Sequence, residues 1–154
     1  MKIKHVAVVF TTLVSASVGL AWAQPANRWT STCSTDRMTD RKACNVTIMI
    51  DPGKRPDDLL GVQVTVASGA IGIVGGHYGS GARIRVDGNP AVSMTGCERS
   101  ICVLLPKQAA SVLKQMRSGS RLLVEFTTVQ GQTIGPWEVS LSGFDAEYQR
   151  ASGS

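Results

Sequence analysis

The chain has little histidine and few aromatic residues, and this scarcity limits the chemistry that it can perform. Only two histidines occur among 154 residues, His5 and His77, and aromatic residues make up 5% of the sequence. Serine and cysteine nucleophiles usually depend on a neighbouring histidine base, so any such site would have to use His77. The Gly-x-Ser-x-Gly pattern of a nucleophile elbow is absent. We therefore predict no catalytic residues, no cofactor and a protein that is not an enzyme.

The chain also lacks an apolar run that is long enough to span a membrane comfortably. Its most apolar run, Val6–Leu20, contains threonine and serine, follows two lysines and ends at Ala21-Trp22-Ala23. A short basic region, an apolar run and a small-x-small step are the three parts of a secretory signal. We expect a signal peptide over residues 1–23, cleaved between Ala23 and Gln24, with no transmembrane anchor after cleavage.

The charge of the chain is modest. The formal net charge is +5, and it falls to +3 when the two lysines of the leader are left out. Because both signs are interspersed over the remainder, charge alone predicts no nucleic-acid partner. We expect one β-rich domain over residues 24–150 and a disordered tail over residues 151–154.

All four cysteines lie after the expected cleavage point, at Cys33, Cys44, Cys97 and Cys102. An even number of cysteines in an exported chain favours disulfides. Four cysteines can pair in three ways. We expect the local disulfides Cys33–Cys44 and Cys97–Cys102, because a polar, turn-rich segment separates the members of each pair. Neither pair has CxxC spacing or a nearby histidine, so we expect no metal site.

Alternation of apolar and polar residues with period two predicts several half-buried strands. The apolar positions of four such strands are Val46, Ile48 and Ile50; Val62, Val64 and Val66; Ile84 and Val86; and Trp137, Val139 and Leu141. One helix is expected over about 106–118, because Pro106 suits its first position, Gly119 suits the residue after its end, and apolar residues recur between them at helical spacing. The pattern predicts a mostly β protein, an antiparallel sandwich or barrel-like domain with this one helix and two disulfides.

Two groups of residues form a candidate binding surface. His77 and Tyr78 lie in the glycine-rich stretch Gly69–Gly81, which we expect to be a bend or a long loop between strands. Arg83 and Arg85 share one face of a predicted strand and could bind a carboxylate, a phosphate or an acidic partner. An ordinary solvated strand face would carry the same two residues.

Several of these features together resemble the invasion-associated locus B family of exported bacterial proteins. The matching residues are Trp29, Cys33, Cys44, Arg85-Val86-Asp87-Gly88, Cys97-Glu98-Arg99-Ser100-Ile101-Cys102, Leu113–Gly119, Arg121–Phe126 and Ser140-Leu141-Ser142-Gly143-Phe144. One departure is Ile101, where the family often has glycine before its last cysteine. The resemblance implies a compact β-rich domain that is periplasmic, outer-membrane associated or secreted, and an association with host-cell invasion and virulence in pathogenic members. It carries over no catalytic residues.

We therefore expect an exported interaction protein that binds a protein or surface polymer in the envelope or on a host cell. Two alternatives stay open. One is a small periplasmic hydrolase that uses His77, and the other is a carbohydrate-binding module built on the aromatic residues.

Overall fold

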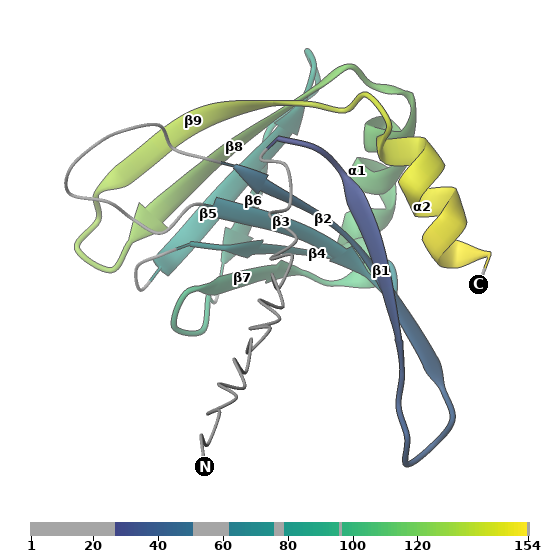
Figure 1. Cartoon of the computed structure of the whole chain (residues 1–154). Coiled ribbons are helices and arrows are strands. Elements are labelled where there is room, and N and C mark those ends of the chain that lie inside the picture. Colours follow the sequence, from purple (N-terminus) through teal and green to yellow (C-terminus); the bar gives the residue numbers. More distant parts are fainter. Residues whose placement is uncertain (1–26, 51–61, 76–78, 96, 154) are drawn as a thin grey trace, which may run out of the picture.

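The computed structural model describes residues 27–50, 62–75, 79–95 and 97–153, which form two antiparallel sheets and two helices (Figure 1). The five-stranded sheet has the order β1 (Thr30–Thr35), β2 (Lys42–Ile50), β3 (Val62–Ala67), β4 (Ala70–Val74), β7 (Ile101–Leu104). The four-stranded sheet has the order β6 (Val92–Thr95), β5 (Gly79–Val86), β8 (Arg121–Thr128), β9 (Thr133–Ser140). The helices are α1 (Pro106–Ser118) and α2 (Phe144–Ser152).

The core lies between the two sheets and follows the alternation of the strands. Val62, Val64 and Val66 of β3 are at most 3% exposed, and the inward residues of β2, β5 and β8 are buried in the same cluster. Strand β7 also contacts β5 and β6, which brings the two sheets together at one corner. The predicted mostly β, antiparallel fold with two disulfides is confirmed.

Helix α1 has the predicted limits. Pro106 is its first residue, and Gly119 follows its last and donates its N–H to the Gln115 carbonyl at 2.7 Å. Ala109, Val112, Leu113 and Met116 form its buried stripe. Figure 1 shows α1 and α2 side by side at one end of the sheets.

A second helix, α2, corrects the expectation of a single helix. It continues through Ala151 and Ser152, two residues that we had expected in a disordered tail. Phe144 is its one fully buried residue, and Tyr148 and Ala151, which share its face at helical spacing, are only partly buried. This short stripe was overlooked in the sequence. The acidic residues Asp145 and Glu147 in its first turn complement the helix dipole.

The glycine-rich stretch is largely strand rather than a long loop. Strand β4 occupies Ala70–Val74, and β5 begins at Gly79. A Cβ atom would lie 2.8 Å from the Phe126 ring at Gly75 and 2.3 Å from it at Gly79. These two glycines therefore make room for a buried aromatic side chain. Residues 76–78 lie outside the described residues.

Candidate interaction site

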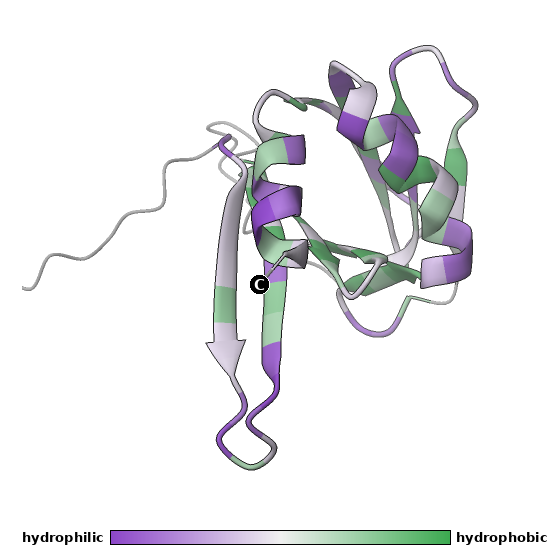
Figure 2. Ribbon diagram, turned by 90° about the vertical axis from the view of Figure 1, so that its right-hand side faces the viewer, coloured by the Kyte–Doolittle hydropathy of each residue, from purple (hydrophilic) through white to green (hydrophobic). Residues whose placement is uncertain are grey.

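Strands β1 and β2 extend beyond the rest of the five-stranded sheet. Toward the hairpin end, the pairing of β2 with β3 stops at Asn45. Strands β1 and β2 continue to pair beyond this point, as far as Thr35 and Lys42. The polar segment between the two cysteines, Ser34–Ala43, therefore forms the end of a two-stranded hairpin. We call residues 32–44 the projecting ribbon (Figures 1 and 2). Every residue from 32 to 43 is exposed.

The predicted disulfide between Cys33 and Cys44 is confirmed and crosses the projecting ribbon. The two cysteines lie directly opposite each other, with Cα atoms 4.0 Å apart. Their side chains therefore point to the same side of the ribbon and meet. A two-stranded ribbon without a core is marginally stable in water. The ribbon is therefore stabilised by this crosslink and not by burial of apolar side chains.

The turn at the tip of the projecting ribbon is held by Asp36. Its carboxylate accepts hydrogen bonds from the Met38 N–H at 2.8 Å and the Thr39 hydroxyl at 2.8 Å. The Asp36 N–H donates to the Arg41 carbonyl at 2.9 Å and closes the turn. The Met38 N–H, followed by the Thr39 hydroxyl, lowers the pKa of Asp36 below its ordinary value. The carboxylate is therefore ionised at neutral pH and keeps these contacts.

This ordered turn presents Met38 to solvent. The residue is 91% exposed, the most exposed large apolar residue of the described chain. Arg37, Arg41 and Lys42 surround it in the sequence, and none of the ion pairs between described residues involves them. The tip thus combines one flexible apolar side chain with charges of both signs, three basic and two acidic over residues 36–42.

The base of the projecting ribbon is fixed to the body through Trp29 and α2. The Trp29 side chain is 2% exposed, donates its Nε1–H to the Ser140 carbonyl at 2.8 Å, and packs edge-on against Phe144 with ring centroids 4.8 Å apart. This anchoring fixes the chain one residue before β1 begins.

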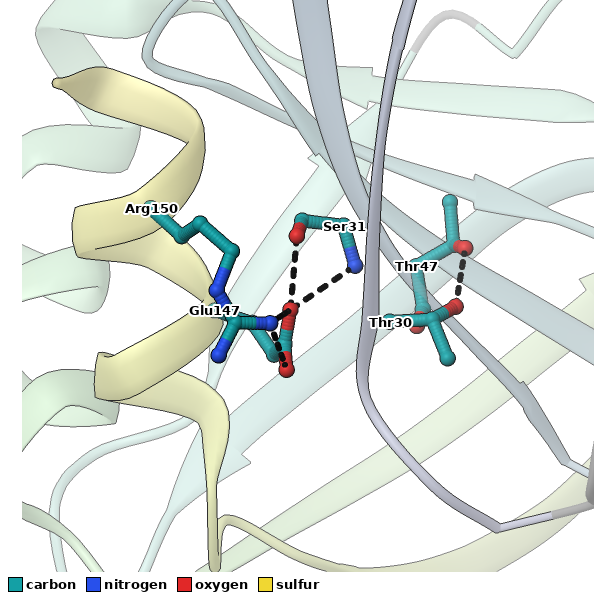
Figure 3. A network of polar contacts seen from close by, with 5 residues as sticks. All are labelled: Thr30, Ser31, Thr47, Glu147 and Arg150. Atoms are coloured by element: carbon teal, nitrogen blue, oxygen red, sulfur yellow. Dashed lines mark hydrogen bonds and ion pairs between the residues drawn. The ribbon is translucent and has the colours of Figure 1, made fainter. Parts of the chain in front are cut away.

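Glu147 of α2 makes a second connection to β1 (Figure 3). Its Oε2 atom accepts hydrogen bonds from the Ser31 N–H at 3.1 Å and the Ser31 hydroxyl at 2.6 Å, and Arg150 Nη1 lies 2.7 Å from Oε1. The Ser31 hydroxyl is the main cause that lowers the pKa of Glu147. An ionised carboxylate on α2 therefore holds the edge strand that carries the ribbon.

Of the predicted surface residues, Arg83 and Arg85 lie on one outward face of β5. Arg83 forms an ion pair with Glu125 of β8, with Nε 2.8 Å from Oε1, and the Arg85 Nε–H donates to the Asp87 carbonyl at 2.9 Å. The charge of Arg83 is thus balanced within the four-stranded sheet, whereas none of the ion pairs between described residues includes Arg85. His77, Tyr78, Ala23 and Gln24 lie outside the described residues.

Sequence reasoning did not identify Met38 as a surface residue. The available signal is one large apolar residue in the middle of the polar segment between Cys33 and Cys44. Its exposure, however, depends on β3 ending at Ala67, short of the hairpin end. The point at which β3 ends relative to the hairpin is set by the register of the sheet and cannot be seen in the local sequence.

A groove of about 580 Å³ between α1 and α2 is lined by Lys114, Arg117 and Asp145, and the last two of these pair with each other. Arg117 Nε lies 2.6 Å from Asp145 Oδ1, and the guanidinium lies 5.4 Å from the centre of the Tyr148 ring.

We find no group of three or more His, Cys, Asp or Glu residues in the described part of the chain that could hold a metal ion. Neither described helix is long and apolar enough to cross a membrane.

The fold and the projecting ribbon together define a small two-sheet β domain with one disulfide at its core and one on an exposed hairpin. The family model of the invasion associated locus B (IalB) protein matches residues 29–152, and the chain belongs to this family. The crystal structure of invasion associated protein B from Bartonella henselae is similar in fold, with a TM-score of 0.54 and 15% sequence identity, covering 84% of this chain and 95% of that one. No curated protein sequence matches the chain.

Proposed function

We propose that the chain is an exported, non-enzymatic interaction protein of the bacterial cell envelope that takes part in host-cell entry. The projecting ribbon is the observation that carries this proposal. A disulfide and an aspartate-centred turn hold it in shape, although its exposed residues contribute almost nothing to the core. Rigid, exposed segments lose little conformational entropy when they bind, which suits them to recognition.

The chemistry of the tip indicates the kind of partner surface that it fits. Methionine is flexible and polarisable and adapts to irregular apolar pockets. Three basic residues flank Met38 in the sequence and outnumber the two aspartates of the tip, Asp36 and Asp40, by one charge. A shallow apolar pocket with an acidic rim complements this tip. We propose a protein on the bacterial or host-cell surface as this partner.

The predicted leader and the disulfides support export. Disulfides persist in oxidising compartments, and both pairs form within the described residues with no cysteine left free among them. We propose a periplasmic or outer-membrane-associated location, or release into the medium, after cleavage at Ala23.

The test is a crosslinking pull-down from envelope extracts and from host-cell membranes, with exported, oxidised protein as bait. Met38→Asp should abolish capture of the partner, because it places a charge where an apolar side chain is needed. Val129→Asp is the matched control, since Val129 is 58% exposed in a different hairpin turn. Equal capture by the two variants would assign binding elsewhere, and no partner for the wild-type bait would remove the interaction function itself.

The carbohydrate-binding alternative loses support from the burial of the tryptophans. Trp29 is 2% exposed, and Trp137 is half-buried and packs against the core. A sugar platform needs a widely exposed aromatic face, which Trp29 does not offer and Trp137 offers only in part. For the hydrolase alternative, a His77→Ala variant that keeps full biological activity would exclude the proposed active residue.

A further inference from the structure

The two disulfides differ in how easily a thiol in solution reaches them. Cys33 is exposed and Cys44 is half-buried, and we call these two residues the ribbon pair. Cys102 is fully buried and Cys97 is partly buried against the core, and these two form the body pair. Thiol–disulfide exchange begins when a thiolate attacks one sulfur, so its rate depends on access to that sulfur. A reductant therefore reaches the ribbon pair first.

The turn between the cysteines of the body pair holds them together. Glu98 and Ile101 exchange two backbone hydrogen bonds of 2.9 Å within this turn. The Ser100 carbonyl accepts a third from the Gly75 N–H at 2.9 Å, which ties the turn to the rest of the domain. Two thiols held close together keep a high effective concentration toward each other. The body pair therefore closes again after any opening.

The projecting ribbon has less support around its cysteines. Among the described strands, β1 has no neighbour on its outer side, and the pairing of β2 with β3 stops at Asn45. A two-stranded ribbon without a core is marginally stable in water. Toward the body, Glu147 accepts two hydrogen bonds from Ser31 and holds β1 at that point. Opening of the ribbon pair therefore loosens residues 32–44 and leaves the body intact.

A positive charge near the ribbon pair favours exchange. Of the five charged residues of the projecting ribbon, Lys42 is the one that lies within a strand, and the other four, two of each sign, lie between β1 and β2. Lys42 precedes Cys44 by two residues, so both side chains project from the same side of β2. A cation beside a disulfide attracts the incoming thiolate and stabilises the thiolate that leaves.

We propose that the Cys33–Cys44 disulfide is a thiol–disulfide exchange site, and that its reduction by a dithiol releases the projecting ribbon and ends recognition at the tip. A thiolate of the reductant attacks Cys33 Sγ, the S–S bond breaks, and the electron pair leaves on Cys44 Sγ, which takes a proton from water. The second thiolate of the reductant then attacks its own sulfur in the mixed disulfide and expels the Cys33 thiolate, which is also protonated. The reductant becomes a disulfide, and the ribbon pair gains two electrons and two protons.

The loss of recognition rests on the proposed function, because it requires that the tip binds a partner. An ordered tip loses little conformational entropy on binding, whereas a released ribbon has to be ordered again in the complex. We expect capture of the partner to become about tenfold weaker when the ribbon pair is open.

The first experiment treats the exported, oxidised protein with graded dithiothreitol, blocks free thiols with iodoacetamide and maps the alkylated cysteines by mass spectrometry. The ribbon pair should react at least about tenfold faster than the body pair. Lys42→Glu should slow this reaction severalfold. Lys107→Glu, the same charge change at an exposed position of α1, is the matched control and should react like wild type. A second series with a Cys-x-x-Cys dithiol protein shows whether a protein reductant also reaches the site or only a small thiol does.

The second experiment measures release of the ribbon by trypsin. Protein that is alkylated only at the ribbon pair should be cleaved after Arg37 and Arg41 about tenfold faster than oxidised protein, because local opening exposes the backbone to the protease. Cys33→Ser with Cys44→Ser should be cleaved at the same increased rate without any alkyl group. The same three forms then serve as bait in the pull-down described above.

Three results would contradict this proposal at different steps. Equal or faster alkylation of the body pair would overturn the exchange site, and unchanged cleavage by trypsin would overturn the release of the ribbon. Neither readout uses the partner, so both remain decisive if the proposed interaction fails. Unchanged capture by the opened bait, together with loss of capture by Met38→Asp, would overturn the switch and leave the recognition function in place.

Discussion

The two disulfides join regions of opposite character. Cys102 is fully buried in β7, and Cys97 packs against the core, so the Cys97–Cys102 bond belongs to the body of the domain. The Cys33–Cys44 bond lies on the projecting ribbon, where the residues between the cysteines are exposed. In the body the crosslink adds to hydrophobic stabilisation, which amounts to about 1.5–3 kcal/mol for each large buried side chain. On the ribbon it replaces such stabilisation.

This difference implies a division of roles. Changes in the body should alter the free energy of unfolding, whereas changes at the ribbon tip should alter recognition and leave stability almost unchanged. The following substitutions test this division, from the largest expected effect on stability to the smallest.

Phe126→Ala should have the largest effect. The ring is 1% exposed and lies against Gly75 and Gly79, which have no side chains to fill the space that it would leave. We expect a loss of about 3–5 kcal/mol in the free energy of unfolding, measured by urea denaturation. Val129→Ala, at an exposed position, is the control and should change little. A loss below about 1 kcal/mol for Phe126→Ala would mean that the body is not held by this core.

Removal of the two disulfides should affect the body more than the ribbon. Loop length alone predicts the opposite order, because the loops of 11 and 5 residues correspond to about 3 and about 2 kcal/mol in the chain-entropy model. Cys97→Ala with Cys102→Ala also empties a buried position, so we expect about 3–4 kcal/mol. Cys33→Ala with Cys44→Ala frees an exposed ribbon that regains entropy in the native state, so we expect about 1–2 kcal/mol.

Thermal and urea unfolding of the two double-alanine variants measure this order. A larger loss for the ribbon pair would show that ribbon and body unfold as one cooperative unit, and the division of roles would then be wrong.

Glu147→Gln should weaken the link between body and ribbon base by about 1–2 kcal/mol, because the carboxylate accepts two hydrogen bonds from Ser31 and pairs with Arg150. The pKa of Glu147 is lowered in the folded protein, chiefly by the Ser31 hydroxyl. Its contribution is therefore complete above the ordinary glutamate pKa of about 4.3 and is lost as the pH falls through the lower pKa of the folded state. The stability difference between wild type and Glu147→Gln should shrink on acidification. A difference that stays constant would assign the effect to packing rather than to charge.

The sequence predicted the elements that local patterns encode. Strands β2 and β3 alternate with period two, α1 begins at proline and ends before glycine, and each disulfide closes a short polar segment. The missed elements depend on distant contacts. Strand β4 lies among glycines that accommodate Phe126, and α2 is held by Trp29 and Ser31.

The same limit applies to the candidate surfaces. Arg83 and Arg85 were correctly placed on one face by alternation, but the pairing of Arg83 with Glu125 follows from the β5–β8 register. The outer face of the five-stranded sheet likewise requires the order of its five strands before the residues on it can be traced. Strand register and strand order are set by the whole fold, so local reasoning could not supply either surface.

Met38→Ala should have the smallest effect on stability and the clearest effect on recognition. The side chain is 91% exposed, so its removal should change the free energy of unfolding by less than about 0.5 kcal/mol. The Met38 N–H still donates to Asp36 in the variant, so the turn keeps its shape. Capture of the partner in the pull-down should nevertheless fall, because the apolar contact is lost, while Val129→Ala should keep both stability and capture. A marked loss of stability in Met38→Ala would show that the tip is packed against the rest of the protein, and the ribbon would then be a structural element rather than a recognition element.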